Sequence, residues 1–207
     1  MSPCLCWQYC FPYFGYCNNS TQDFLMLLNI VFTSFLLLFP LILSGSFHMV
    51  VVKRNWLSRL AIPISEKRFG RNKTWRGIVV MVVATIPTTY FIYLIAPYFS
   101  HFLLVDLYEV NPAWLGALLG LGYVIPELPN SYVKRRLNIP PGEPASKNTF
   151  WFSLIDQADS PAGCVIVYAL MVNTPVSVLI CTLLLGPLIH LVINLSLFSL
   201  GLRKQPV

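Results

Sequence analysis

The stretch FLMLLNIVFTSFLLLFPLILSGSFHMVVV, residues 24–52, decides the class of this protein. It contains no Asp, Glu, Lys or Arg. A helix of about 20 apolar residues crosses the hydrocarbon core of a bilayer, which is roughly 30 Å thick. The stretch therefore predicts a transmembrane helix. Its excess length and the proline at position 40 predict that this helix is tilted or kinked.

The rest of the chain has the same character. Of its 207 residues 56% are hydrophobic and 11% are charged, whereas a soluble domain carries about 25% charged residues. Four more apolar stretches cover residues 77–99, 113–133, 152–172 and 176–200. Backbone polar groups in lipid must be satisfied within helices or closed barrels, which excludes an open sheet. We therefore expect an all-α integral membrane protein with about five transmembrane helices, forming one domain over residues 24–207.

The positions of the charges predict a topology. All fourteen Lys and Arg residues lie in three stretches, 53–76, 134–147 and 203–204. The loop at residues 100–111 has Asp106 and Glu109 but no basic residue. The positive-inside rule then places the N-terminus outside and the C-terminus in the cytoplasm of a cell (inner or plasma) membrane. Because the basic residues border apolar stretches, membrane lipids explain the net charge of +6, and no nucleic-acid partner is expected.

Residues 1–23 form an extension rich in cysteine and aromatic residues. Four cysteines lie within its first 17 residues, at positions 4, 6, 10 and 17. Their spacing matches no zinc motif. If the extension is outside the cell, disulfides among these cysteines are one outcome; an extension without a catalytic role is the other.

Two basic motifs are candidates for phosphate binding. FGRNKTWRG, residues 69–77, places Lys73, Thr74 and Arg76 at the expected start of a helix near Trp75, with Asn72 or Thr74 as its N-cap. A helix N-terminus with free N–H groups, a lysine and a hydroxyl suits phosphate. SYVKRR, residues 131–136, lies at the end of a predicted span, and its KRR follows that span. An ordinary basic loop at a membrane boundary is the alternative for each motif.

Three carboxylates are candidates for metal binding. Asp156 and Asp159 are three residues apart, so they share a helix face, in the first two turns of a helix expected to begin near residue 152. Desolvation and repulsion disfavour two such charges unless a cation compensates them, and Mg²⁺ is held by carboxylates, waters and phosphates. Glu127 could be a third ligand, because Pro126 and Pro129 should break the helix there. The alternative is that Asp156 and Asp159 bind no metal and only stabilise the N-terminus of their helix through its dipole.

Other residues suggest packing within the membrane. Small residues at four-residue spacing, at positions 116 and 120, predict close helix approach. His190 and Asn194 are four apart and face the same way, either joining helices or supporting a site. His48 and His101 lie near membrane boundaries, and we expect no role for them.

Taken together, these motifs resemble those of the membrane cytidylyltransferases that make CDP-activated lipids, and within them the CDP-archaeol synthase family. The resemblance runs from residue 24 to the C-terminus. It rests on FGRNKTWRG, on Ser131 with Lys134, Arg135 and Arg136, on Gly142, on LIDQAD at residues 154–159, and on the ending from His190 to Lys204. The family has Gly-Asp where this chain has Pro126-Glu127, and Glu127 keeps the charge with one more methylene.

The resemblance implies an enzyme of phospholipid biosynthesis. It would transfer a cytidylyl group from CTP to a lipid phosphate, archaeol-phosphate-like or phosphatidate, giving CDP-lipid and pyrophosphate on the cytoplasmic side. The implied Mg²⁺ ligands are Glu127, Asp156 and Asp159. The implied CTP-binding residues are Asn72, Lys73, Thr74, Arg76 and Ser131, and the implied catalytic residues are Lys73, Arg76, Lys134, Arg135, Asp156 and Asp159. A homodimer is compatible with this reading. The alternative is a non-catalytic membrane protein of the same descent that binds lipid headgroups or assists assembly; a transporter is disfavoured, since no inverted repeat is found.

Overall fold

The computed structural model describes residues 19–143 and 149–202, which fold into helices joined by short loops. Elements follow in the order α1 (Asn19–Lys53), η1 (Ser58–Leu60), α2 (Glu66–Phe69), α3 (Trp75–Ile95), η2 (Ala96–Phe99), η3 (Leu107–Glu109), α4 (Pro112–Val124), α5 (Glu127–Arg136), α6 (Thr149–Met171) and α7 (Val176–Ser199). The described residues contain no β-strand, only an isolated bridge between Pro63 and Thr74. The all-α prediction is thus confirmed. The four N-terminal cysteines, Lys147, Arg203 and Lys204 lie outside the described residues.

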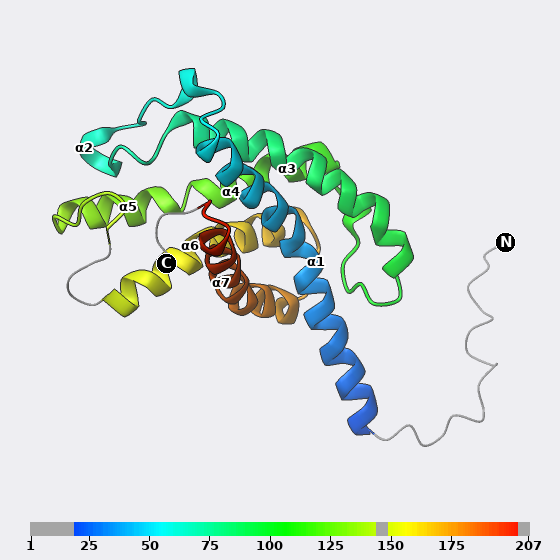
Figure 1. Ribbon diagram of the computed structural model, residues 1–207. Coiled ribbons are helices and arrows are strands. Elements are labelled where there is room, and N and C mark those ends of the chain that lie inside the picture. Colours follow the sequence, from blue (N-terminus) through cyan, green and yellow to red (C-terminus); the bar gives the residue numbers. More distant parts are fainter. Residues whose placement is uncertain (1–18, 144–148, 203–207) are drawn as a thin grey trace, which may run out of the picture.

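Five long helices pack in a closed cycle. α1 contacts α3, α3 contacts α4, α4 contacts α6, α6 contacts α7, and α7 returns to α1. In Figure 1, α2 and α5 lie at one end of this bundle, and the first turns of α1 project from the other side. The short α2 packs against α5, so the 53–76 loop and the residues after α4 meet at the same end.

Three helices of the described chain are long and apolar enough to cross a membrane: Thr21–Lys53, Trp75–Phe99 and Val176–Ser199. The predicted interruption of the apolar stretch 113–133 is confirmed, because α4 ends at Val124 and α5 begins at Glu127. The break lies at the expected place, since Pro126 lacks a backbone donor. The 13 residues of α4 are therefore about 20 Å long, less than a bilayer core.

The starts of α3 and α6 differ in how well they were predicted. α3 begins at Trp75 as expected, with Thr74 as N-cap: the backbone N–H of Gly77 donates to Thr74 Oγ1 at 3.4 Å. α6 is described from Thr149, earlier than expected, because no proline or glycine lies between positions 144 and 161 to delay it. Asp156 and Asp159 therefore lie in its second and third turns, which corrects the predicted first two.

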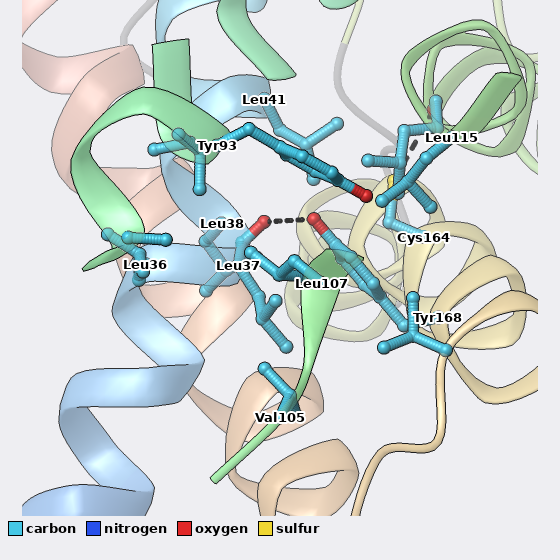
Figure 2. Packing of buried hydrophobic residues seen from close by; sticks show 14 of the residues in the cluster. Leu36, Leu37, Leu38, Leu41, Tyr93, Val105, Leu107, Leu115, Cys164 and Tyr168 are labelled. Carbon is cyan, nitrogen blue, oxygen red and sulfur yellow. Dashed lines mark hydrogen bonds between the residues drawn. The ribbon is translucent and has the colours of Figure 1, made fainter. Parts of the chain in front are cut away.

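The core lies where α1 meets the other helices. Figure 2 shows Leu37 and its neighbours on α1 facing Tyr93, Leu115 and Tyr168. Tyr168 is 2% exposed, and its hydroxyl donates to the Leu37 carbonyl at 2.7 Å. A buried tyrosine hydroxyl needs such an acceptor, because an unpaired polar group in an apolar core is costly. This bond therefore orients α6 against α1.

Glycines set the distances between α3, α4 and α6. A Cβ on Gly120 would lie 2.6 Å from the Cα of Val82, and one on Gly116 would lie 2.7 Å from the Cα of Ile86. A Cβ on Gly122 would lie 3.0 Å from the Gly163 carbonyl oxygen on α6. The prediction of close approach at small residues is confirmed. Because α5 follows α4, this packing also sets the position of Glu127.

Replacing Gly120 by alanine should destabilise the bundle, because the new methyl group meets the α3 backbone, which cannot move aside. We expect a loss of about 1–3 kcal/mol, measured as a lower thermal unfolding midpoint in detergent. Gly45→Ala is the matched control, since its Cβ would lie 3.5 Å from the Tyr123 hydroxyl, an ordinary contact. Equal midpoints for the two variants would contradict the close packing of α3 on α4.

Candidate functional site

The polar residues of the motifs gather where the start of α3, the whole of α5 and the middle of α6 meet. Lys73, just before α3, forms an ion pair with Glu127 at the start of α5. The other oxygen of Glu127, Oε1, accepts a hydrogen bond of 2.9 Å from the Ser160 hydroxyl on α6. One carboxylate therefore joins three segments that are far apart in the sequence.

Asp156 and Asp159 are joined to this group through α5. The side-chain amide of Asn130 donates to Asp156 Oδ1 at 2.6 Å and to Asp159 Oδ2 at 2.9 Å. Lys134, one turn further along α5, forms an ion pair with Asp156. Asp159 Oδ1 accepts from the backbone N–H of Ser160 at 2.7 Å. The structure thus brings the three predicted carboxylates to one place, linked by Asn130 and Ser160.

This cluster is rich in oxygen ligands but is held together by lysines. Among residues 19–143 and 149–202, no group of three or more His, Cys, Asp or Glu side chains is close enough to hold a metal ion as the side chains stand. Three carboxylates face two lysines, which leaves one negative charge uncompensated. Carboxylate, amide and hydroxyl oxygens are the ligands of hard cations such as Mg²⁺. The donor set therefore fits such an ion, provided the lysines and Asn130 yield to it.

Lys73 is charged in this setting. Burial alone would lower its pKa, but the carboxylate of Glu127 and the hydrogen bond to it raise the pKa above its ordinary value, with Asp159 and Asp156 contributing. A lysine that keeps its proton across the neutral range is a permanent cation. It suits electrostatic binding of a phosphate rather than proton transfer.

Two glycines hold the loop before α3 against the segment after α5. Gly70 has φ 85°, and a Cβ there would lie 2.9 Å from Cγ of Pro141. Gly142 has φ 82°, and a Cβ there would lie 3.1 Å from Nδ2 of Asn72. Both positions need a residue without a side chain, for the backbone angle and for the space. The loop that carries Asn72 and Lys73 is thereby held against the segment that follows α5.

The positively charged guanidinium of Arg135 has two nitrogens for which the described residues supply no hydrogen-bond acceptor. Its Nε and Nη1 atoms are buried and have no hydrogen-bond partner among the described residues. A shielded guanidinium that lacks an acceptor is unfavourable. A phosphate would supply acceptors for both nitrogens, because the guanidinium fork matches its geometry. Ser131 lies on the same helix, one turn before Arg135.

Arg76 is placed differently from the other predicted phosphate-binding residues. It is 8% exposed, and its Nη1 donates to Asn55 Oδ1 at 3.1 Å and to the Trp56 carbonyl at 3.3 Å. These acceptors belong to the turn after α1. Thr74 Oγ1 accepts from the α3 backbone as N-cap. The described contacts of Arg76 and Thr74 are therefore structural ones.

Sequence reasoning missed three residues of this region. Asn130 and Ser160 lie next to predicted site residues, and their position beside Ser131 and Asp159 was the available signal. His48 carried no motif, and we expected no role for it. In the structure His48 lies against the start of α3: a Cβ on Gly77 would lie 3.6 Å from its Nε2.

The polar pair on α7 joins helices. Asn194 donates to Gln157 Oε1 at 2.9 Å, and Gln157 lies between the two aspartates on α6. His190 Nε2 lies 3.1 Å from the Tyr123 hydroxyl on α4. α7 is thus tied to the helix that carries Asp156 and Asp159, which supports their position.

Comparisons with known proteins agree with the motifs. The family model described as "CarS-like: CDP-archaeol synthase" matches residues 26–207. A CDP-archaeol synthase of Thermofilum pendens is 33% identical over 142 residues, which cover 68% of this chain and 60% of that relative. The CDP-archaeol synthase of Methanospirillum hungatei is 31% identical over 170 residues, covering 79% of this chain and 92% of the relative.

A third CDP-archaeol synthase, from Pyrococcus furiosus, is 32% identical over 139 residues, covering 67% of this chain and 74% of the relative. The chain spans less than two thirds of the length of the Thermofilum relative. No solved structure is a significant match. The family model covers nearly the whole chain, including every residue of the site described above. The chain belongs to the CarS-like family of CDP-archaeol synthases.

Proposed function

We propose that this protein transfers a cytidylyl group from CTP to a lipid phosphate, which gives a CDP-lipid and pyrophosphate. The observation that carries the proposal is the convergence of Glu127, Asp156 and Asp159 with Lys73 of the FGRNKTWRG motif at one end of the bundle. Membership of the family supports it, since the relatives are named CDP-archaeol synthases.

The reaction explains the density of charge. A phosphate oxygen of the lipid forms a bond to the α-phosphorus of CTP, and the bond from that phosphorus to the departing pyrophosphate breaks. The nucleophile is already an anion, so no general base is required. Two highly charged phosphates repel each other, and positioning with charge neutralisation therefore supplies most of the catalysis.

We assign the residues as follows. Glu127, Asp156 and Asp159 would hold a divalent cation, in our proposal Mg²⁺, which supplies positive charge next to the triphosphate when bound. Lys73 and Lys134, which otherwise pair with these carboxylates, would then bind phosphate oxygens. Asn72, Thr74 and Ser131 would line the nucleotide site. Arg135 would bind the lipid phosphate or pyrophosphate through its two unpaired nitrogens. Arg76 would position the turn after α1.

We further propose that the chain crosses the cell membrane five times, with the site on the cytoplasmic face. The loop at residues 53–76 and α5 carry most of the Lys and Arg residues and lie at the site's end of the bundle. By the positive-inside rule, Lys and Arg residues next to membrane spans favour the cytoplasmic side, which would place this end of the bundle in the cytoplasm. The acidic loop at residues 100–111 follows the far end of α3. Membrane lipids would then deliver the lipid phosphate from the inner leaflet.

The proposal also specifies which lipid phosphate is the substrate, which depends on the lipid tail. The names of the relatives favour an archaeol-type phosphate over phosphatidate. Both lipids present the same phosphate group to the cluster, so both belong in the assay. A homodimer remains a prediction from the sequence. Nothing among the described residues favours the non-catalytic alternative.

Labelled CTP tests the reaction itself. Membranes containing the protein should move label from the α-phosphate of CTP into the lipid extract, while label in the γ-phosphate should appear in pyrophosphate. Asp159→Asn should reduce the rate at least about 100-fold, because charge stabilisation of this kind is worth several kcal/mol. The matched control is Asp106→Asn, in the loop before η3, where asparagine can still cap and the rate should be unchanged. Undiminished activity of Asp159→Asn would remove Asp159 from the site.

Cation binding tests the carboxylate cluster independently of turnover. Binding of Mn²⁺, followed by electron paramagnetic resonance in the presence of CTP, should weaken by about 10- to 100-fold in Glu127→Gln, by loss of one charged ligand. Glu127→Asp should weaken it less, because the charge remains. Glu109→Gln on η3 should bind Mn²⁺ like the unaltered protein. If Glu127→Asp binds more weakly than Glu127→Gln, Glu127 is not a ligand.

A further inference from the structure

The side chain of Asn130 lies between the two aspartates of α6. Its Nδ2 donates to Asp156 Oδ1 at 2.6 Å and to Asp159 Oδ2 at 2.9 Å, so one amide nitrogen bridges two carboxylates. Ionised carboxylates only accept hydrogen bonds, and therefore the nitrogen of the carboxamide, not its oxygen, faces them. A neutral donor thus lies at the point from which a cation would compensate both charges.

The helical spacing of α5 brings Asn130 to this point. Glu127, Asn130 and Lys134 are three and four residues apart, so they lie along one face of α5. Each of them contacts α6: Glu127 accepts from Ser160, while Asn130 and Lys134 donate to Asp156. Asn130 is therefore at the centre of the face with which α5 meets the acidic motif.

Asp159 is the carboxylate of the cluster that the described residues leave without a basic partner. The two ion pairs in the described part of the chain involve the other two carboxylates. Asp159 accepts from Asn130 and, at 2.7 Å, from the backbone N–H of Ser160, and both of these donors are neutral. Neutral donors solvate a carboxylate but leave its charge uncompensated. The pair of aspartates that Asn130 bridges therefore favours a bound cation.

A carboxamide suits such a place both with and without a bound cation. It has two donors on Nδ2 and two lone pairs on Oδ1, and rotation about the Cβ–Cγ bond exchanges the two atoms. The hydrogen bonds from the side chain of Asn130 to the two aspartates both use Nδ2. Hard cations accept amide oxygens as ligands beside carboxylates. An aspartate at position 130 would add repulsion without a cation, and a lysine would compete with the cation.

We propose that Asn130 is a ligand of the divalent cation. Its amide nitrogen bridges Asp156 and Asp159 as the structure shows, and its carboxamide oxygen turns to a cation that binds between them. The inference rests on the proposed function and adds a neutral oxygen donor to the three carboxylates assigned there. It commits to a hard divalent cation, because all of these donors are oxygens.

Electron–nuclear double resonance of bound Mn²⁺ tests the ligand directly and without turnover. The full-length protein is produced with ¹³C at the side-chain carbonyl of its asparagines and is loaded with Mn²⁺ alone in detergent. We expect a ¹³C coupling to Mn²⁺ that Asn130→Ala abolishes. Asn138→Gly is the matched control: Asn138 is exposed and follows α5, and glycine accommodates its φ of 57°. This control should keep the coupling.

The affinity for Mn²⁺ gives a second measurement, which a purely structural role would not explain. Asn130→Ala should weaken binding about 10-fold, through loss of one neutral ligand. Asn130→Asp should bind at least as tightly as the unaltered protein, because it supplies a charged oxygen. Its thermal unfolding midpoint without added cation should nevertheless be lower, because three carboxylates then face one another. Adding Mn²⁺ should restore that midpoint, and this variant decides the matter if Asn130→Ala does not fold.

Three results would overturn the proposal. The first is absence of the ¹³C coupling in the unaltered protein, or its survival in Asn130→Ala. The second is an Mn²⁺ affinity of Asn130→Ala equal to or above that of the unaltered protein, as for an amide that only bridges the aspartates. The third is weaker binding by Asn130→Asp than by Asn130→Ala.

The failure of this inference and that of the proposed function are distinguishable. Binding of Mn²⁺ that depends on Asn130, without transfer of label from CTP to lipid, would contradict the proposed function and leave Asn130 as a ligand. Transfer of label by the unaltered protein, together with unchanged Mn²⁺ binding in both variants, would remove Asn130 from the ligands and leave the proposed function standing.

Discussion

The ion pair between Lys73 and Glu127 is the contact on which the site depends. Lys73 lies in the loop before α3, and Glu127 begins α5, 54 residues later. Glu127 also accepts from Ser160, so the same carboxylate reaches α6. Charges that are largely buried in a membrane protein are costly unless they are paired or coordinated. This pairing therefore brings the basic motif and the acidic motif together, and a cation or phosphate must compete with it.

Close helix packing makes this pairing geometrically available. α4 packs against α3 and α6 through glycines, which keeps its end close to both. α4 ends at Val124 and α5 begins at Glu127, and α5 presents Asn130 and Lys134 to Asp156 on α6. The close packing of the helix backbones thus positions a polar helix at the end of an apolar bundle.

Arg76 shows how a motif can serve more than one purpose. FGRNKTWRG supplies Lys73 to the charged cluster, Thr74 as the cap of α3 and Arg76 to the turn after α1. These residues are consecutive or nearly so, but a helix start directs them to different sides. The pattern alone suggested a single phosphate-binding group. The contacts divide it between the cluster, the helix end and the turn after α1.

The sequence by itself determined the all-α membrane character, the start of α3, the break near Glu127 and the family, because apolar length, prolines, caps and local motifs are properties of neighbouring residues. It also named the three carboxylates, and it named Lys73 and Lys134 as phosphate-binding candidates; their pairing with the carboxylates came from the structure. Only the tertiary structure decided that Asn130 and Ser160 connect the carboxylates, that His48 lies against Gly77 at the start of α3 and that Arg76 points to another segment. Those contacts join residues from different helices, and the packing of the helices, which no local pattern encodes, determines which side chains meet.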